Sequence, residues 1–281
     1  VLGRIYDGSA GAGAGAATSA RLGAAPYPER ALRAAIAEAA AWGAELLVVK
    51  GDLTRVATVA EVRDAGRLLA TSPVPVAAIL GNHDNRLGVD TRGLLASQGI
   101  DIAWAPQAVD VPGLRIVLVD TTHGDARHHR GRLSAPVAAR VAALAGEVAT
   151  GAMVVLHHPP EMHRYPTVYP PGIPFAEGRR LLDALAESHP ATLVTCGHRH
   201  RNRRYGYGPI TITEVSATKD YPGVWAGYRV FEGGIVQTVR RISSPDVIGW
   251  TETTRRAVNG QWGRWSPGRL ADRCFSIDWP G

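Results

Sequence analysis

The chain has 281 residues, 45% of them apolar, and a formal net charge of +6 from 31 basic and 25 acidic residues. This apolar fraction is ample for a buried core, and the length suits one large domain or two small ones. No apolar run approaches the roughly 18 residues that would span a bilayer, and no signal peptide is visible, so we expect no membrane partner.

A basic surface attracts phosphate groups in general, including those of nucleic acids. However, the only arginine-rich run that is joined to an aromatic residue is 201–205, so we consider a nucleic-acid partner unlikely. Two cysteines, Cys196 and Cys274, provide no disulfide framework. Both lie in apolar contexts, which favours buried free thiols and a cytoplasmic location.

The first part of the chain alternates helical and strand patterns after a Gly/Ala/Ser-rich loop at 8–25. Apolar residues at helical spacing and short β-branched runs distinguish the two kinds of element. The predicted order is helix 30–42, strand 46–50, helix 57–70 and strand 74–80. This alternation indicates an α/β fold with helices flanking a sheet.

The alternation continues beyond residue 93 and then changes character. The predicted elements are strands 100–104 and 114–119, helix 136–149, strand 152–156, helix 176–187 and strand 192–196, followed by antiparallel strands 209–215, 225–231 and 235–242. A loop as long as 159–174 is typical of a substrate wall or lid. The polar loop that carries His123, His128 and His129 is expected to be solvated. We expect one domain over 1–243, with a Trp/Arg-rich extension over 244–281 packed on it.

Polar side chains follow four of the apolar strands. Asp52 comes after the first, Asn82 after the second, His157 after the third, and His198 with His200 after the fourth. Ligands bind at the carboxyl ends of strands in open α/β sheets. Carboxylate, amide oxygen and imidazole are the ligands of hard or borderline divalent metals. The sequence therefore predicts a metal site, with Asp52 able to bridge two ions.

Two ions about 3.5–4 Å apart can share a hydroxide of lowered pKa, which is a nucleophile near neutral pH. They can also clamp the attacking and leaving oxygens of a phosphoryl group. The glycines that accompany these strand ends, Gly51, Gly81 and Gly197, suit tight turns in crowded surroundings.

Taken together, the motifs resemble those of the calcineurin-like metallophosphoesterase superfamily. They are Gly51-Asp52, Gly81-Asn82-His83-Asp84, His157-His158-Pro159-Pro160 and Gly197-His198-Arg199-His200. The resemblance implies a four-layer α-β-β-α sandwich of mixed sheets flanked by helices, and two divalent ions, with Mn, Fe and Zn all suitable.

Within that resemblance, Asp52 would bridge the metals, Asn82 and His198 would bind one ion, and His200 would bind the other. His157 is favoured as a further ligand, with His158 structural. His83 would be catalytic and face the substrate, and Asp84 would orient its ring.

The family opens with an Asp-x-His motif at the end of its first strand, and this chain has none. One interpretation is that Asp7 supplies part of that motif, although position 9 is Ser9. The other, which we favour, is that residues 2–7 resemble the loop that follows the motif, so that the first strand would lie upstream of Val1. On either interpretation, the ion that His200 would bind has an incomplete ligand set.

Two further stretches resemble the cyclic-nucleotide phosphodiesterase-like branch of the superfamily. One runs from Asp120-Thr121-Thr122 to Gly131-Arg132-Leu133, and the other is Ser216-Ala217-Thr218. They imply a small phosphodiester substrate, either a cyclic nucleotide or a glycerophosphodiester, attacked by the metal-bridging hydroxide. The alternative is a catalytically impaired protein of the same fold that acts as a binding scaffold. The resemblance leaves open a homo-oligomer.

Overall fold

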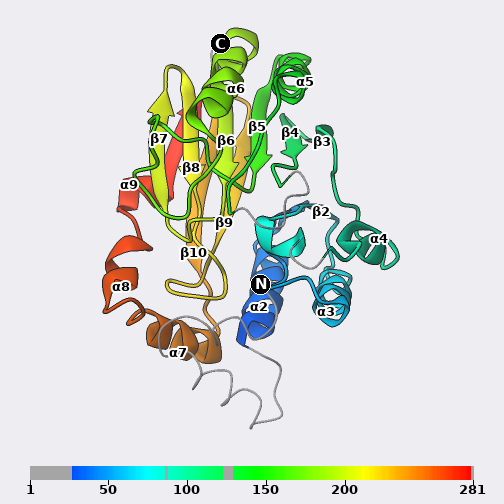
Figure 1. Cartoon of the computed structure of the whole chain (residues 1–281), viewed down its shortest axis with the longest axis vertical. Helices are drawn as coiled ribbons and strands as arrows, with labels where there is room; N and C mark the ends of the chain where they lie inside the picture. Colours follow the sequence, from blue (N-terminus) through cyan, green and yellow to red (C-terminus); the bar gives the residue numbers. More distant parts are fainter. Residues whose placement is uncertain (1–26, 86–87, 123–128, 280–281) are drawn as a thin grey trace.

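The structure is a computed structural model that describes residues 27–85, 88–122 and 129–279, so Asp7 lies outside the described residues. Its largest sheet has six strands in the order β3-β4-β5-β6-β8-β7 (Figure 1). The strands are β3 (Gln107–Val111), β4 (Leu114–Val119), β5 (Gly151–Leu156), β6 (Thr192–Cys196), β8 (Ile210–Glu214) and β7 (Arg203–Tyr207). The inner four strands run parallel, and the two edge strands are antiparallel to their neighbours.

Both faces of this sheet are apolar because its inner strands are nearly continuous runs of apolar residues. In β4, Val117 and Val119 pack toward helices α5 (Ala135–Gly146) and α6 (Phe175–Ser188), which cover one face. Ile116 and Leu118 alternate with them and pack on the opposite side. The carboxyl ends of β4, β5 and β6 therefore lie side by side at one edge.

Two smaller sheets cover the opposite face. The first pairs β1 (Leu47–Lys50) with β2 (Val76–Ile79) in parallel. The second is antiparallel and consists of β9 (Val224–Phe231), β10 (Gly234–Arg241) and β11 (Cys274–Asp278), in the order β11-β10-β9. Side chains of both small sheets share one core with the face of the large sheet that carries Ile116 and Leu118.

Helices α2 (Tyr27–Ala41), α3 (Val59–Leu69) and α4 (Thr91–Ala96) cover the outer side of β1 and β2. The beginning of α3 is defined by a capping box, in which Thr58 and Glu61 exchange side-chain-to-backbone hydrogen bonds. The layers are thus α5 and α6, the six-stranded sheet, the two small sheets, and α2 to α4. The predicted four-layer α-β-β-α sandwich is confirmed.

Three details differ from the predictions. The short strand expected at 100–104 is reduced to one bridge between Ile102 and Ala78, and the strand forms at β3 instead. The edge strand β7 was not predicted. Cys196 is buried as expected, but Cys274 is exposed, because β11 is the edge strand of its sheet.

The C-terminal extension forms α7 (Pro245–Thr254), α8 (Gln261–Trp265), α9 (Leu270–Arg273) and β11. Since β11 pairs with β10 along its whole length, the extension contributes to the sandwich itself. The division into 1–243 and 244–281 stays a prediction.

A cavity of about 520 Å³ lies between β1 and β9. Its walls are mainly apolar side chains, including Ile36, Val48 and Val230, and it reaches Asp52 and His157 at one end. Among the described strands, β1 pairs only with β2, and β9 only with β10. Within the described part of the chain, no helix has the length and apolar character needed to cross a membrane.

Candidate metal centre

Three of the predicted ligands have a left-handed backbone. The φ angles of Asp52, His198 and His200 are 56°, 68° and 49°. For residues other than glycine this conformation costs on the order of 1–3 kcal/mol, and such residues concentrate at functional sites. The turns after β1 and β6 therefore hold these side chains in orientations that an ordinary strand end would not produce.

Close packing of two turns explains why glycine precedes Asp52 and Asn82. Gly51 has a φ of 85°, and a Cβ on it would collide with the backbone of Gly81. A Cβ on Gly81 would in turn collide with Asp52. The ends of β1 and β2 can thus approach closely only with glycine at both positions, as predicted for these crowded strand ends.

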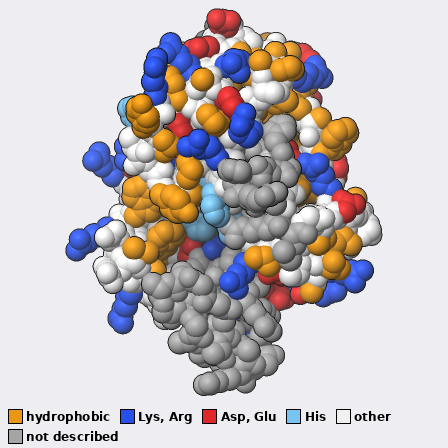
Figure 2. All heavy atoms as spheres, viewed as in Figure 1, with side chains coloured by type: hydrophobic (Ala, Val, Ile, Leu, Met, Phe, Trp, Pro, Cys, Tyr) orange, Lys and Arg blue, Asp and Glu red, His pale blue; other side chains and the backbone are white. Residues whose placement is uncertain are grey.

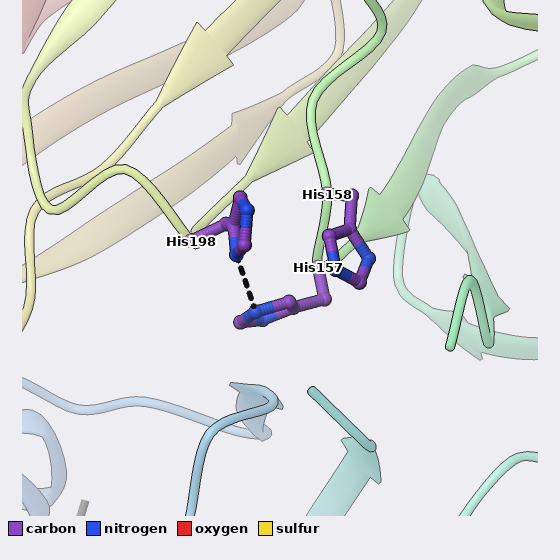
Figure 3. Close-up of side chains that lie close together, drawn as sticks. All are labelled: His157, His158 and His198. Atoms are coloured by element: carbon purple, nitrogen blue, oxygen red, sulfur yellow. Dashed lines mark hydrogen bonds between the residues drawn. The ribbon is translucent and has the colours of Figure 1, made fainter. Parts of the chain in front are cut away.

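His157 lies at the centre of the assembled side chains. Its Nε2 is 3.3 Å from Oδ2 of Asp52, 3.2 Å from Oδ1 of Asn82 and 3.2 Å from Nδ1 of His198. All four residues are buried. Figure 3 shows ring nitrogens of His157 and His198 facing each other from the ends of β5 and β6.

Carbonyl groups determine which ring nitrogen carries the proton in both histidines. Nδ1 of His157 lies 2.7 Å from the Lys50 carbonyl, and Nε2 of His198 lies 3.2 Å from the Pro171 carbonyl. Because a carbonyl oxygen only accepts, these nitrogens carry N–H in the neutral rings. The two nitrogens that face each other are then the unprotonated ones.

Four atoms with lone pairs therefore converge: Asp52 Oδ2, Asn82 Oδ1, His157 Nε2 and His198 Nδ1. Such an arrangement is repulsive unless a cation lies among them. This donor set of one carboxylate, one amide oxygen and two imidazoles fits a divalent transition metal ion. The outer carbonyl partners of the two rings match the way that protein metal sites orient histidine ligands.

The electrostatics of the site show that Asp52 stabilises positive charge beside it, whether a proton on His157 or a bound cation. Burial alone would raise the pKa of Asp52, but the neighbouring His157 holds it well below its usual range. Burial would lower the pKa of His157, but the charge and hydrogen bond of Asp52 raise it. Burial and the neighbouring His157 lower the pKa of His198 well below its usual range, so its ring is neutral, as a ligand must be.

His158 lies beside both His157 and His198. Its Nδ1 is 2.8 Å from Oγ1 of Thr121, and its ring centre is 4.4 Å from that of His198. A Cβ on Gly131 would overlap the His158 side chain. One ligand atom from each of His157, His158 and His198 lies within 4.8 Å of the others. The structural role assigned to His158 stays a prediction.

The turn after β2 presents Asn82 and His83 (η2, Asn82–Asn85). Nδ1 of His83 lies 2.7 Å from the Arg55 carbonyl, whereas Asp84 accepts hydrogen bonds from Thr54 and from the Gly81 backbone. Burial and the charge of Asp52 raise the pKa of Asp84 to about 6. The prediction that Asp84 orients the His83 ring does not match these contacts, because the Arg55 carbonyl contacts the ring and Asp84 fixes the turn.

His200 lies apart from these four residues. It contributes to the wall of the same cavity as Asp52, His157 and His198, and its Nδ1 lies 2.8 Å from Oδ2 of Asp220. Arg199, between the two histidines, is buried and pairs with Glu161 and Glu214. These ion pairs fix the turn that carries His198 and His200.

His129 lies at the site, although its sequence context indicated a solvated residue. Its Nδ1 is 3.3 Å from Nδ2 of Asn82. It is exposed, and its ring centre is 6.4 Å from that of His83. His123 and His128 lie outside the described residues. Figure 2 shows histidine side chains at the surface near the centre of the face drawn there.

Comparison with known proteins agrees with the fold. The model of the calcineurin-like phosphoesterase family matches residues 23–202. The chain belongs to the calcineurin-like phosphoesterase family. It is 30% identical, over 180 residues, to the glycerophosphodiester phosphodiesterase GpdQ of Enterobacter lignolyticus, which covers 62% of each chain. A probable cyclic nucleotide phosphodiesterase of Synechococcus is 26% identical over 191 residues, covering 67% of this chain and 71% of that protein.

Solved structures share the fold. GAP50, described as the anchor in the inner membrane complex of Plasmodium, superposes with a TM-score of 0.56 at 12% identity, covering 90% of this chain and 85% of that one. TT1561 of Thermus thermophilus has a TM-score of 0.50 at 12% identity, covering 76% and 93%. The chain matches less than two thirds of the length of GpdQ. Family membership supports a metal-dependent phosphoesterase.

Proposed function

We propose that this chain hydrolyses a small phosphodiester, either a cyclic nucleotide or a glycerophosphodiester, at a centre of two divalent ions. The observation that carries the proposal is the convergence of four lone-pair atoms from Asp52, Asn82, His157 and His198. Two relatives that are named as phosphodiesterases support the substrate class.

The first ion would be held by those four residues, and the second by Asp52 and His200. Divalent ions at such a site supply Lewis-acid stabilisation of a phosphoryl oxygen and lower the pKa of bound water. The residues around them orient the substrate and move protons.

His83 is the residue that we assign to proton transfer. Since its Nδ1 donates to the Arg55 carbonyl, the neutral ring keeps Nε2 unprotonated and able to exchange a proton. Its backbone N–H also donates to Oδ1 of Asp52, which ties the position of His83 to that of the bridging carboxylate. A protonated His83 would donate to the leaving oxygen, and Asp84 would keep the turn in place.

The test combines metal analysis with hydrolysis of bis(p-nitrophenyl) phosphate, with and without added manganese. Asn82→Ala should lose both metal and activity, because it removes a ligand. His83→Ala should keep its metal and lose about 10²–10⁴-fold in rate, which is the usual contribution of general acid–base catalysis. Gln107→Ala, at an exposed position of the edge strand β3, is the matched control.

Unchanged activity in both variants would contradict the roles assigned to Asn82 and His83. Wild-type protein without metal or turnover would instead favour the scaffold alternative. If the wild type is active, its rates with glycerophosphoethanolamine, cyclic AMP and p-nitrophenyl phosphate would separate diesterase from monoesterase activity.

A further inference from the structure

His200 and Asp220 form a close, mostly buried pair beside the site. Nδ1 of His200 lies 2.8 Å from Oδ2 of Asp220. The Asp220 side chain is 1% exposed, and that of His200 is 20% exposed. Because an ionised carboxylate only accepts hydrogen bonds, Nδ1 of His200 is the protonated nitrogen. The unprotonated nitrogen of the neutral ring is therefore Nε2.

Lys219 accompanies this pair. Its ammonium nitrogen lies 3.6 Å from the same Asp220 oxygen, and its side chain is 4% exposed. A buried carboxylate needs nearby positive charge to stay ionised. Lys219 thus keeps Asp220 in the form that accepts the His200 N–H.

The C-terminal extension holds both members of the pair from outside. The Trp262 ring meets the His200 ring edge-on, with ring centres 5.8 Å apart at 80°. Nε1 of Trp250 donates to the Lys219 carbonyl over 2.9 Å, and Oγ1 of Thr254 accepts from the Tyr221 backbone N–H over 2.8 Å. The segment 215–223 and the His200 ring are therefore both packed against α7 and α8.

We propose that Asp220 is a positioning residue that fixes the proton of His200 on Nδ1 and so presents Nε2 to a divalent ion, with Trp262 limiting rotation of the ring. The inference rests on the proposed metal-dependent function, which it deepens. The same logic operates at His157 and His198, where backbone carbonyls hold one ring nitrogen each. At His200 the outer partner is a carboxylate, one of the usual outer partners of histidine ligands at metal sites.

Long-range ¹H–¹⁵N spectra of the histidine rings test the proposal directly, first in the metal-free wild-type chain. His200 should show the Nδ1–H form, and added Zn²⁺ should shift its Nε2 resonance. A predominant Nε2–H form, or a Nε2 resonance that Zn²⁺ leaves unchanged, would overturn the proposal. Both measurements use the wild-type chain, so they hold even if a variant fails to fold.

Variants then identify the cause. Asp220→Ala should abolish the preference for Nδ1–H at His200 and weaken Zn²⁺ binding at His200 by about 10–100-fold, the usual cost of losing an outer partner. The Zn²⁺ responses of His157 and His198 should persist. Asp220→Glu should restore part of the preference, and Trp262→Leu should weaken binding less. Asp246→Ala, an exposed carboxylate of the same C-terminal region at 70% side-chain exposure, is the control.

The two proposals fail in different ways. Absence of any Zn²⁺ response at His157 and His198 would contradict the proposed function. Intact responses there, with His200 unchanged in Asp220→Ala, would contradict only the role of Asp220.

Discussion

The two halves of the proposed metal centre are built by different means. The half around His157 consists of residues at the ends of adjacent strands, and Nε2 of His157 contacts the other three donors directly. The half around His200 depends on Asp220 from the loop before β9 and on Trp262 from the C-terminal extension. The first half follows from strand topology, whereas the second needs distant segments to fold onto it.

The two halves also differ in the kind of group that orients their histidine rings. Backbone carbonyls orient the rings of His157 and His198, and a strand end keeps such groups in place whatever side chains surround them. The ring of His200 is oriented by a side chain, so a single substitution can release it. We therefore expect the His200 half to be the more easily lost.

The largest expected effect comes from removing one ligand in each half. His157→Ala should lose both ions and reduce activity by more than about 100-fold, since it removes a ligand where loss of an outer partner already costs about 10–100-fold. His200→Ala should keep the ion of the first half. Mass spectrometry of the metal content per chain measures the difference. Equal metal loss in the two variants would contradict the proposed difference between the two halves.

Lys50 connects the first half of the site to the large sheet, and its titration should make the stability of the chain depend on pH. Its ammonium donates to Oγ1 of Thr195 and to the Cys196 carbonyl, and burial lowers its pKa to about 8. An unfolded lysine stays protonated up to about pH 10.4, so between pH 8 and that value the unfolded chain binds more protons than the folded one. The stability of the wild type should therefore rise with pH in this window.

Lys50→Met removes this titration while keeping a similar volume. The difference in free energy of unfolding between wild type and variant should change by about 3 kcal/mol, in favour of the wild type, from pH 8 to pH 10.4. Urea denaturation at several pH values measures it. A difference that does not vary with pH would show that the Lys50 ammonium is solvated.

The smallest effect expected is on thermal stability. An ion bound at 100 times its dissociation constant stabilises the folded state by about 2.7 kcal/mol. Chelation should then lower Tm by roughly 5–10 °C for a chain of this size, and added Mn²⁺ should restore it. In His157→Ala the same treatment should leave Tm unchanged; an equal shift there would place the stabilising ion elsewhere.

Much of the first half was predictable from the sequence. Short apolar runs ending in Gly51-Asp52, Gly81-Asn82 and Gly197-His198 indicate parallel strands, and parallel strands bring their carboxyl ends to one edge. The alternation of strands and helices indicated an α/β fold, and the resemblance to the calcineurin-like superfamily implied its four layers.

The second half was not predictable, for a physical reason. Asp220, Lys219 and Trp262 belong to segments without helical or strand periodicity around the site, and nothing local to them indicates His200 as a neighbour. Likewise, the His83 ring contacts the backbone carbonyl of Arg55. Every residue has such a carbonyl, so the residue type at position 55 does not indicate this contact.

The sequence by itself determined the layered α/β architecture and the kinds of atom available to bind metal, because periodicity and side-chain chemistry are local properties. Only the tertiary structure decided which nitrogen of each ring is unprotonated. That choice depends on which acceptor lies beside the ring: the carbonyl of Lys50 for His157, that of Pro171 for His198, and the carboxylate of Asp220 for His200. These partners come from separate parts of the chain and meet only when it folds.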